Sequence, residues 1–537
     1  MEGENQERIF QAMERPDFYP HPVSDIEQRE THISKVFLTG EYVYKIKKPV
    51  NLEFLDFTTL EKRYHFCRQE VILNRRLTRD VYLDVVPITC KEGHYELAGS
   101  GTPVEYAVKM RQLPGNCSLV RLLRKGKIDI TAIESLAMCL AGFYSKAPSG
   151  KHISTFGSWE RVWENSEENF RQTAPFVEKP LDKRMFQILR AANRSFLQRQ
   201  KGLFEHRIKC QKIRDCHGDL RAGHIYITPE IQIIDCIEFN ERFRYGDSAS
   251  DLAFLAMDLD HEGYPEIARD LLSAYVRHSK DRDLFLLLNF YKCYRAVVRV
   301  KVNCFRLQED HLSRKEKCRL FKETEDYMNL AFRYAVQFAC PVLWVICGLP
   351  ASGKTAIAEA LAETTGARIF RSDVVRKGLF GLKPSEPRDA PFQKGIYSKE
   401  AGSLTYGKLL LLAQEEIQRG HSVILDATYG KRNHRQEVIR MAKDMDANLI
   451  FVECVCPEDL IRERLRVREK LPSESDARLH HLERIRAAFE PLDEIRDEMH
   501  ILVHTDRPIE ESLQQILSQD YDRLARQTEK TIHQKDR

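Results

Sequence analysis

The chain has 537 residues, which is longer than one hydrophobic core usually spans, so two or three domains are expected. Its 84 Lys and Arg residues against 80 Asp and Glu residues give a formal net charge of +4, with both signs interspersed along the chain. This near balance gives no global argument for binding nucleic acid or a membrane. A local phosphate site remains compatible with it, because such a site needs only a few placed cations.

The spacing of the cysteines and the polarity of the first residues bear on the cellular compartment of the protein. The 14 cysteines are scattered from Cys67 to Cys456, and no pair of CxxC knuckles has zinc spacing. The opening MEGENQERIF is too polar for a signal peptide, and no run approaches the roughly 18 apolar residues of a membrane span. We therefore expect a protein of the reducing cytoplasm, with no membrane partner.

Short strand-like runs come first in the chain. HISKVFLT and YVYKI flank a turn at Gly40 and predict a hairpin, and VYLDVVPIT and EYAVKM predict two further strands. Between them, residues from about 58 to 77 carry apolar side chains at helical spacing. The pattern predicts a small antiparallel lobe with one helix inserted.

The rest of the chain changes pattern twice. From about 128 to 336 it is mostly helical, interrupted from Ile213 to Phe239 by a strand-loop-strand passage that contains DCHGDL and IQIIDCIEF. Pro341 predicts a boundary, and after it strands and helices alternate as in a doubly wound parallel sheet. The predicted parts are residues 1–337, residues 341–522 and a frayed polar tail, 523–537.

The string GLPASGKT lies between an apolar strand and an amphipathic helix, which is the context that the Walker A pattern requires. Its backbone is expected to wrap phosphate, while Lys354 reaches the β and γ phosphates and Thr355 holds Mg²⁺. A plain glycine-rich turn with a surface lysine is the alternative. The predicted nucleotide-binding residues are Gly348, Leu349, Pro350, Ala351, Ser352, Gly353, Lys354 and Thr355.

Two carboxylates are expected beside this loop. Asp426 ends the apolar strand SVILD, the usual place for a residue that orients Mg²⁺. Asp373 follows the strand ARIFRS and is a candidate base for an attacking hydroxyl. Its alternative role, which does not exclude the first, is that of a helix N-cap.

An arginine-rich helix, LIRERLRVREK, supplies further cations. Arg464 and Arg468 are four residues apart and share one face, which suits a catalytic lid over the transferring phosphate. The alternative is a solvated face whose arginines pair with Glu463 and Glu469.

GLPASGKT, the RSD at 371–373, the DAT at 426–428 and the arginine-rich helix together resemble the polynucleotide-kinase and zeta-toxin branch of P-loop kinases. That resemblance covers roughly residues 341 to 510. It implies transfer of the γ phosphate of ATP to a hydroxyl, and leaves the acceptor open.

HGDL at 217–220 and IID at 233–235 resemble the catalytic passage of aminoglycoside phosphotransferases. The resemblance implies that Asp219 accepts the proton of the acceptor and that Asp235 binds Mg²⁺. Lys45 and Glu70 resemble the pair that holds the α and β phosphates, and residues 105–114 then lie where the hinge between lobes is expected.

One residue departs from that family. Its pattern HGDxxxxN has asparagine as a second Mg²⁺ ligand, whereas this chain has His224, and imidazole suits softer metals. The resemblance therefore leaves open whether this half transfers phosphate. Lys47 and Lys48 also compete with Lys45 for the phosphate role, and a solvated basic strand end is the alternative for all three.

Over nearly the full chain, the arrangement resembles bacterial proteins in which an aminoglycoside-phosphotransferase-like domain precedes a P-loop kinase-like ATPase domain. EFLDFTTLEKR, YLDVVPIT, CHGDL, IIDCIEFNERFRYGD and SDLAFLAMDLD carry this resemblance. The expected fold class is an α+β bilobal protein-kinase-like domain followed by an α/β P-loop domain.

The leading hypothesis is an ATP- and Mg²⁺-dependent phosphotransferase that acts on a small-molecule or nucleotide-like acceptor, with its principal site in the P-loop domain. One alternative is a nucleotide-dependent switch or scaffold that transfers nothing. A 5′-hydroxyl polynucleotide kinase ranks third, because Arg371, Arg376, Lys377 and Lys383 supply charge with few interleaved aromatics. Oligomeric state has no signal in the sequence.

Overall fold

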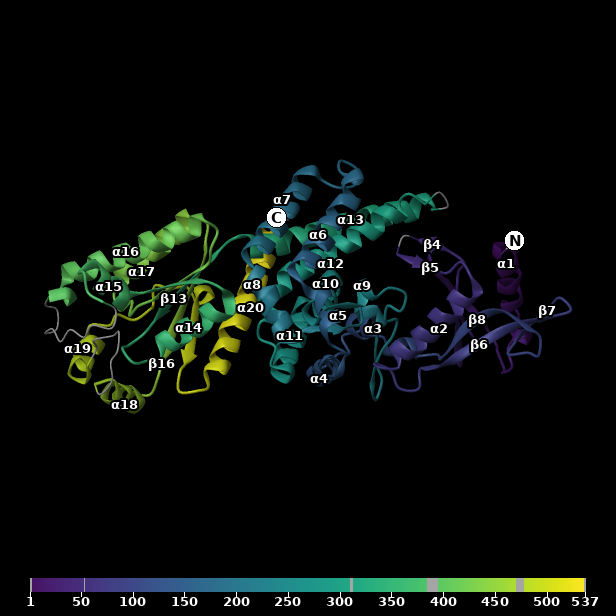
Figure 1. The fold of residues 1–537 in the computed structure, drawn as a ribbon, viewed down its shortest axis with the longest axis horizontal. Coiled ribbons are helices and arrows are strands. Elements are labelled where there is room, and N and C mark those ends of the chain that lie inside the picture. Colours follow the sequence, from purple (N-terminus) through teal and green to yellow (C-terminus); the bar gives the residue numbers. More distant parts are fainter. Residues whose placement is uncertain (1, 53, 310–311, 384–394, 470–477, 536–537) are drawn as a thin grey trace. The chain divides into compact units, whose positions relative to one another are not determined.

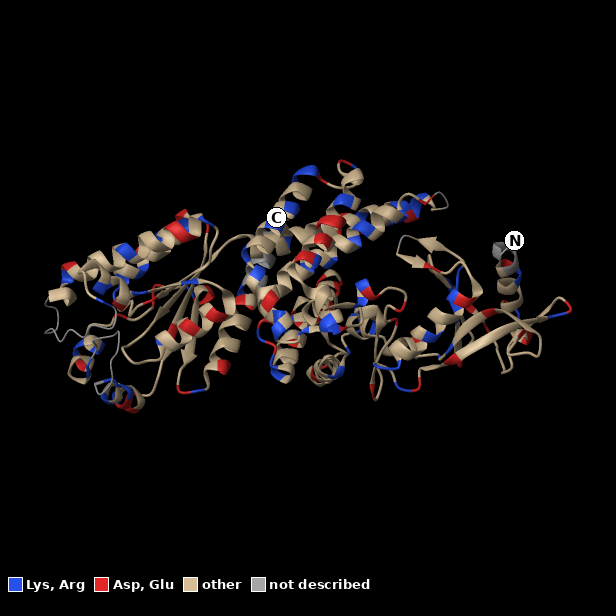
Figure 2. Ribbon diagram, viewed as in Figure 1, with Lys and Arg blue, Asp and Glu red and all other residues tan. Residues whose placement is uncertain are grey.

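The computed structural model describes residues 2–52, 54–309, 312–383, 395–469 and 478–535. The chain, coloured in Figure 1 from its N-terminus in purple to its C-terminus in yellow, divides into two compact units. The first unit comprises Met1–Val162 with Arg207–Asp281, and the second comprises Trp163–His206 with Arg282–Arg537. Figure 2 shows basic and acidic residues interspersed over both units.

The first unit contains a six-stranded sheet in the order β1-β2-β3-β8-β6-β7, with antiparallel neighbours throughout. The predicted hairpin at Gly40 and the inserted helix are both confirmed, since β2 pairs with β3 and α2 contacts β6 and β8. The strands are β1 (Glu27–Glu30), β2 (Ser34–Leu38), β3 (Tyr42–Lys47), β6 (Tyr82–Lys91), β7 (His94–Leu97) and β8 (Thr102–Arg111), preceded by α1 (Glu2–Met13), with β4 (Asn51–Leu52), β5 (Leu55–Asp56) and α2 (Leu60–Asn74) between β3 and β6.

Helices and short strands make up the rest of the first unit. The predicted strand-loop-strand passage is more divided than expected, because β9 pairs with β12 while β10 and β11 form their own hairpin. The helices are α3 (Leu119–Arg124), α4 (Ile130–Lys146), α5 (Lys151–Ser154), α9 (Glu241–Arg244), α10 (Ser248–His261) and α11 (Pro265–Ser279), and the strands are β9 (Ile213–Asp215), β10 (Ile225–Ile227), β11 (Ile231–Ile233) and β12 (Tyr245–Asp247).

Long helices precede the parallel sheet in the second unit. Apolar and aromatic side chains hold them together: Phe196 stacks on Phe290 at 4.8 Å between ring centroids, and both rings contact Phe338. Ser313 and Glu316 form a capping box that starts α13. These helices are α7 (Lys183–Arg199), α12 (Leu284–Arg306) and α13 (Arg314–Ala339), while α6 (Trp159–Thr173) and α8 (Lys201–Lys209) cross from one unit to the other.

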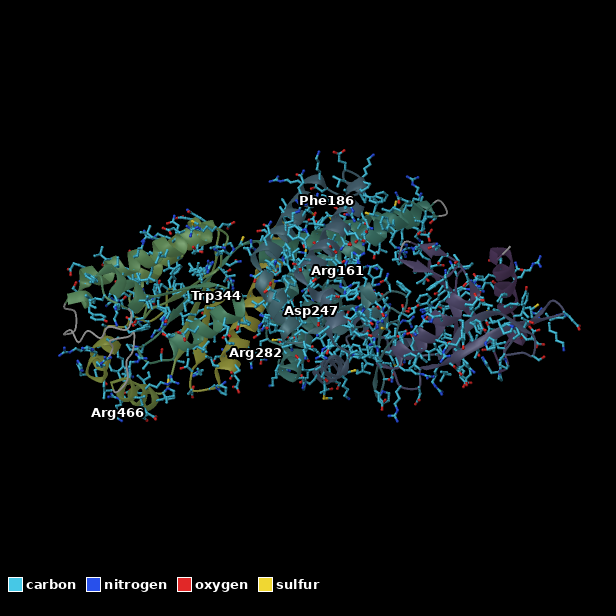
Figure 3. All side chains as sticks on the ribbon, viewed as in Figure 1. Arg161, Phe186, Asp247, Arg282, Trp344 and Arg466 are labelled. Carbon is cyan, nitrogen blue, oxygen red and sulfur yellow. The ribbon has the colours of Figure 1, made fainter. Side chains whose placement is uncertain are left out.

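The five-stranded sheet of the second unit is parallel, in the order β14-β15-β13-β16-β17. Helices α16 and α17 lie on one side of it, and α14 and α20 lie on the other (Figure 1). Trp344, labelled in Figure 3, marks β13 in the middle of the sheet. The elements are β13 (Val342–Cys347), α14 (Lys354–Thr365), β14 (Arg368–Arg371), α15 (Ser372–Leu379), α16 (Lys399–Gln418), β15 (Val423–Asp426), α17 (Arg432–Asp444), β16 (Asn448–Val455), α18 (Glu458–Glu469), α19 (Leu482–Ala487), β17 (His500–His504) and α20 (Ile509–Lys535).

The expected fold class is confirmed by these two sheets, one antiparallel with a helical lobe and one parallel with helices on both faces. The strand order reverses at β13, so the loop after β13 lies at the switch point where such sheets bind ligands. Pro341 falls inside the second unit, in the turn between α13 and β13, and its role as a domain boundary stays a prediction.

The frayed tail is a correction. Helix α20 continues to Lys535, and the last two residues of the predicted tail lie outside the described residues. The segment from 523 to 535 is polar but holds no Gly or Pro and is rich in Arg, Gln, Glu and Lys, which favour helix. Among the helices that the structure describes, none is long and apolar enough to cross a membrane.

Candidate functional site

The loop from Gly348 to Gly353 joins β13 to α14 in a shape that requires glycine at its two ends. Gly348 has φ +132°, and a Cβ there would lie 2.4 Å from the carbonyl oxygen of Cys454. Gly353 has φ +87°, and its Cβ would lie 2.8 Å from Cβ of Thr505. In the described residues no side chain caps α14, so its first amides face the loop as donors for an anion.

Lys354 and Thr355 begin α14 inside this loop. The ammonium of Lys354 donates to the carbonyl oxygen of Leu349 at 2.7 Å. Desolvation lowers the pKa of Lys354, and the charges of Asp426 and Asp373 act against that shift. Thr355 Oγ1 donates to Asp426 Oδ2 at 2.7 Å, so two side-chain oxygens meet at the carboxyl end of β15. Oxygens of this kind fit Mg²⁺.

Asp426 is buried, and desolvation raises its pKa, while Lys354 and the hydrogen bond from Thr355 oppose that rise. The negative charge of Asp373 also raises the pKa of Asp426. Arg371 Nε also lies 3.7 Å from Asp426 Oδ2. The predicted Mg²⁺ ligands Thr355 and Asp426 are therefore adjacent, and the charges of Lys354 and Arg371 act on Asp426.

Asp373 is the second residue of α15, whose N-cap is Arg371. The alternative prediction of Asp373 as the N-cap is therefore wrong. Arg376, one turn later, donates to Asp373 Oδ1 at 2.9 Å and lies over the ring of Tyr397 at 4.9 Å. The contact fixes one oxygen of Asp373, and its role as a base stays a prediction.

The arginines of α18 differ in their surroundings. Arg464 donates to the carbonyl oxygens of Ala351 at 3.2 Å and Thr505 at 2.9 Å, so it ties the P-loop to the end of β17. Desolvation lowers the pKa of Arg468, while Asp373 and Asp426 act against that shift, which places Arg468 in the field of the site. Arg466 is exposed at the outer side of α18 (Figure 3). The catalytic roles of Arg464 and Arg468 stay predictions.

The alternative for this helix is a solvated face whose arginines pair with neighbouring glutamates. Arg462 does form such pairs, but with other glutamates than the sequence suggested. Arg462 pairs with Glu458 at 2.6 Å and also contacts Glu483, and the side chain of Glu469 lies outside the described residues.

Sequence reasoning missed Thr505. Its hydroxyl donates to the carbonyl oxygen of Ser352 at 2.6 Å, and its own carbonyl accepts from Arg464. The one signal in the sequence was its position just after the last predicted strand, HILVH, because strand ends of a parallel sheet converge on the same edge.

The first unit holds a second candidate site around Lys45 of β3. Lys45 Nζ lies 2.8 Å from Glu70 Oε1 and 2.7 Å from Asp235 Oδ1. Desolvation lowers the pKa of Lys45. The negative charges of Asp235 and Glu70 have the larger combined effect, so the pKa of Lys45 is raised. The structure thus brings together the three residues that the sequence proposed for nucleotide and metal.

The competing lysines have other partners. Lys47 is fully buried, bonds Glu70 Oε2 at 2.7 Å and contacts Glu238. Lys48 pairs with Glu30, which is exposed. Within the described residues, Lys45 is therefore the lysine of these three that forms an ion pair with Asp235.

The loop that carries Asp219 is pinned by Asp251 of α10, which accepts from the backbone amides of His217 at 2.6 Å and Gly218 at 3.0 Å. His224 Nδ1 lies 2.9 Å from the carbonyl oxygen of Asp219. Lys45 and His224 hold the pKa of Asp235 below its ordinary value, against the effect of desolvation. Asp251 lay within a segment that carried the family resemblance, but nothing in the sequence assigned it this role.

Comparison with known proteins identifies a domain in the second unit. Residues 343–492 match the family model of the AAA domain, which confirms the predicted P-loop domain. Solved structures similar to parts of this chain include a gluconokinase from Sinorhizobium meliloti, with 20% identity, 36% of this chain and 97% of that chain covered, and a TM-score of 0.25. The GDP complex of an aminoglycoside 2′-phosphotransferase has 14% identity, 60% and 98% coverage and a TM-score of 0.39.

Relatives from two mycobacterial species match most of the chain. Uncharacterized proteins of Mycobacterium tuberculosis and Mycobacterium bovis are each 31% identical to it over 465 residues, which is 86% of this chain and 90% of each relative. The chain therefore belongs to the family of these mycobacterial proteins, with an AAA domain in its C-terminal part.

Proposed function

We propose that this chain is an ATP- and Mg²⁺-dependent phosphotransferase whose principal site is the P-loop of the second unit. The observation that carries the proposal is the 2.7 Å hydrogen bond from Thr355 to Asp426, directly beside Lys354. A phosphate-binding loop, a cation and a pair of oxygens for Mg²⁺ then stand at one edge of one sheet.

In the proposed reaction, the loop amides and Lys354 bind the phosphates of ATP, and Thr355 and Asp426 hold Mg²⁺, which when bound offsets phosphate charge. Asp373 takes the proton of the acceptor hydroxyl, whose oxygen bonds to the γ phosphorus. The bond from that phosphorus to the bridging oxygen of ADP breaks, and ADP leaves with the electron pair. Arg468 stabilises the charge that spreads over the transferring group.

We place the acceptor among small molecules or nucleotide-like compounds. Three of the four cations considered for a nucleic-acid path are engaged within the protein, which leaves the exposed Lys383: Arg376 donates to Asp373, Arg371 contacts Glu359 at 3.1 Å, and Lys377 is fully buried. A polynucleotide needs such cations in contact with its backbone.

The test is to incubate the full chain with γ-labelled ATP and separate small-molecule and macromolecular fractions of a cell extract. Label in the small-molecule fraction, absent with Lys354→Ala, is expected. Label in RNA or DNA ends would favour the polynucleotide kinase. ATP-dependent protection from proteolysis with no labelled product would favour the switch or scaffold.

A further inference from the structure

Three metal-ligating side chains come together in the first unit, outside the site of the proposed function. Asp219 follows β9, His224 ends the short turn before β10, and Asp235 follows β11. One ligand atom from each lies within 4.8 Å of the others. Within the described residues, no other group of three or more His, Cys, Asp or Glu side chains has its ligand atoms within this distance of one another.

The backbone fixes which nitrogen of His224 faces this cluster. Nδ1 lies 2.9 Å from the carbonyl oxygen of Asp219, and a carbonyl oxygen only accepts, so Nδ1 carries a hydrogen and donates it. In the neutral ring, Nε2 then presents its lone pair. Histidines that bind metals usually have this second contact, because it fixes the tautomer and the ring orientation.

Asp235 is divided between two neighbours. Oδ1 accepts from Lys45 at 2.7 Å, and Oδ2 lies 3.7 Å from His224 Nε2. That separation is too long for a hydrogen bond. Two ligands that are each about 2.1 Å from a tetrahedral metal lie about 3.4 Å apart, so a metal fits between these atoms after a shift of a few tenths of an ångström. Asp219 supplies the third ligand, because one ligand atom of each of the three residues lies within 4.8 Å of the others.

The donor set does not fit Mg²⁺, which takes oxygen ligands. One imidazole nitrogen with two carboxylates suits Mn²⁺, Fe²⁺, Co²⁺ or Zn²⁺. We propose that Asp219, His224 and Asp235 form a binding site for a first-row transition-metal dication, and that His224 makes this site discriminate against Mg²⁺. The proposal is independent of the function assigned to the P-loop site, because the two use different residues in different units.

The competing structure is a metal-free cluster in which a protonated His224 lies between the two carboxylates. It predicts no nitrogen bound to any metal and no preference among dications. Spectroscopy on a bound ion therefore distinguishes the metal site from the metal-free cluster, whereas a measurement of activity does not.

The experiment uses the full chain without nucleotide and carries Asp426→Ala to remove the metal ligand of the P-loop. Mn²⁺ is titrated by electron paramagnetic resonance, and ¹⁴N coupling is measured on the bound ion. We expect one Mn²⁺ with imidazole coupling, displaced only by Mg²⁺ in large excess. His224→Asn should abolish the coupling and weaken Mn²⁺ binding at least about tenfold. Asp235→Asn should weaken Mn²⁺ binding while the fold is retained.

His278→Asn is the matched control, because His278 also lies beside a carboxylate, at 2.7 Å from Glu134, in the same unit. It should leave the coupling and the affinity unchanged. Bound Mn²⁺ without ¹⁴N coupling, Mg²⁺ that competes equally, or an affinity unaffected by His224→Asn would each overturn the proposal. Circular dichroism of each variant shows whether lost binding comes from lost folding.

Discussion

In the second unit, Thr355 and Asp426 place two oxygens together, whereas in the first unit His224 places an imidazole nitrogen beside Asp219 and Asp235. The lysines differ as well. Lys354 bonds a backbone carbonyl, while Lys45 is held by Glu70 and Asp235. Phosphate at Lys45 must compete with two carboxylates, so the comparison indicates that charge balance, more than the presence of a lysine, separates a strong phosphate site from a weak one.

The largest expected effect is the loss of turnover in Lys354→Ala. The variant removes the cation that follows the γ phosphate into the transition state, and we expect kcat/KM for ATP to fall about a thousandfold in the full chain. Lys443→Ala, at an exposed position in the last turn of α17, should change it less than twofold and serves as the control. If turnover survives Lys354→Ala and disappears in Asp219→Asn, the chemistry belongs to the first unit.

The second prediction concerns the stability of the first unit. Lys47→Met leaves Glu238 buried without its lysine, and breaking a buried pair from one side costs about 3 kcal/mol or more in the free energy of unfolding. Lys48→Met removes a pair with the exposed Glu30 and should cost under about 1 kcal/mol. Urea unfolding of the full chain compares the two variants. An equal loss of unfolding free energy in the two variants would mean that the buried ion pairs of Lys47 stabilise the first unit no more than a surface pair does.

Asp373→Asn should separate binding from transfer. The amide keeps the shape of the side chain but takes no proton, so transfer to the true acceptor should fall at least about a hundredfold. The Kd for ATP should stay within about twofold, because Asp373 accepts a hydrogen bond from Arg376 and is not among the residues proposed to bind the phosphates. Transfer by the variant at a near-normal rate would reduce Asp373 to a positioning residue.

The fourth prediction addresses nucleotide at the first unit, in a chain that carries Lys354→Ala. His224→Asn exchanges a nitrogen ligand for an amide oxygen that suits Mg²⁺, so Mg²⁺-ATP should bind about tenfold more tightly. Asp235→Ala should remove the difference between ATP affinities measured with and without Mg²⁺. Calorimetry reads both. Absence of ATP binding by the folded Lys354→Ala chain and by its His224→Asn form would show that the first unit has the motif without its ligand.

Much of the fold and of the P-loop site could be predicted from the sequence, because both depend on local patterns. The loop and its helix are contiguous in GLPASGKT, and Asp426 ends an apolar strand. The choice among lysines could not be predicted, since Lys45 and Lys47 are two residues apart and share one face of β3. The two lysines differ in burial, since Lys47 is fully buried and Lys45 is not. Their partners Glu70 and Glu238 come from distant segments of the chain, so this difference cannot be seen in the local sequence.

The residues that hold the P-loop in place could not be predicted either, because they too come from distant segments. Arg464 and Thr505 reach it from α18 and from the end of β17, more than a hundred residues later in the chain. The helical pattern of LIRERLRVREK places Arg464 and Arg468 on one face, but it does not say what that face meets.

The smallest expected effect distinguishes these two arginines. Arg464→Ala removes two hydrogen bonds to the carbonyls of Ala351 and Thr505, which loosens the loop before ATP arrives. Because a charged hydrogen bond contributes about 1.5 kcal/mol or more, we expect the Kd for ATP to rise about tenfold while kcat at saturating ATP changes little. Arg466→Ala, from the exposed side of the same helix, should change neither. Arg468→Ala should lower kcat with little change in Kd, since Arg468 shares the field of Asp373. A fall in kcat with an unchanged Kd for Arg464→Ala would instead make Arg464 the lid residue that the sequence predicts.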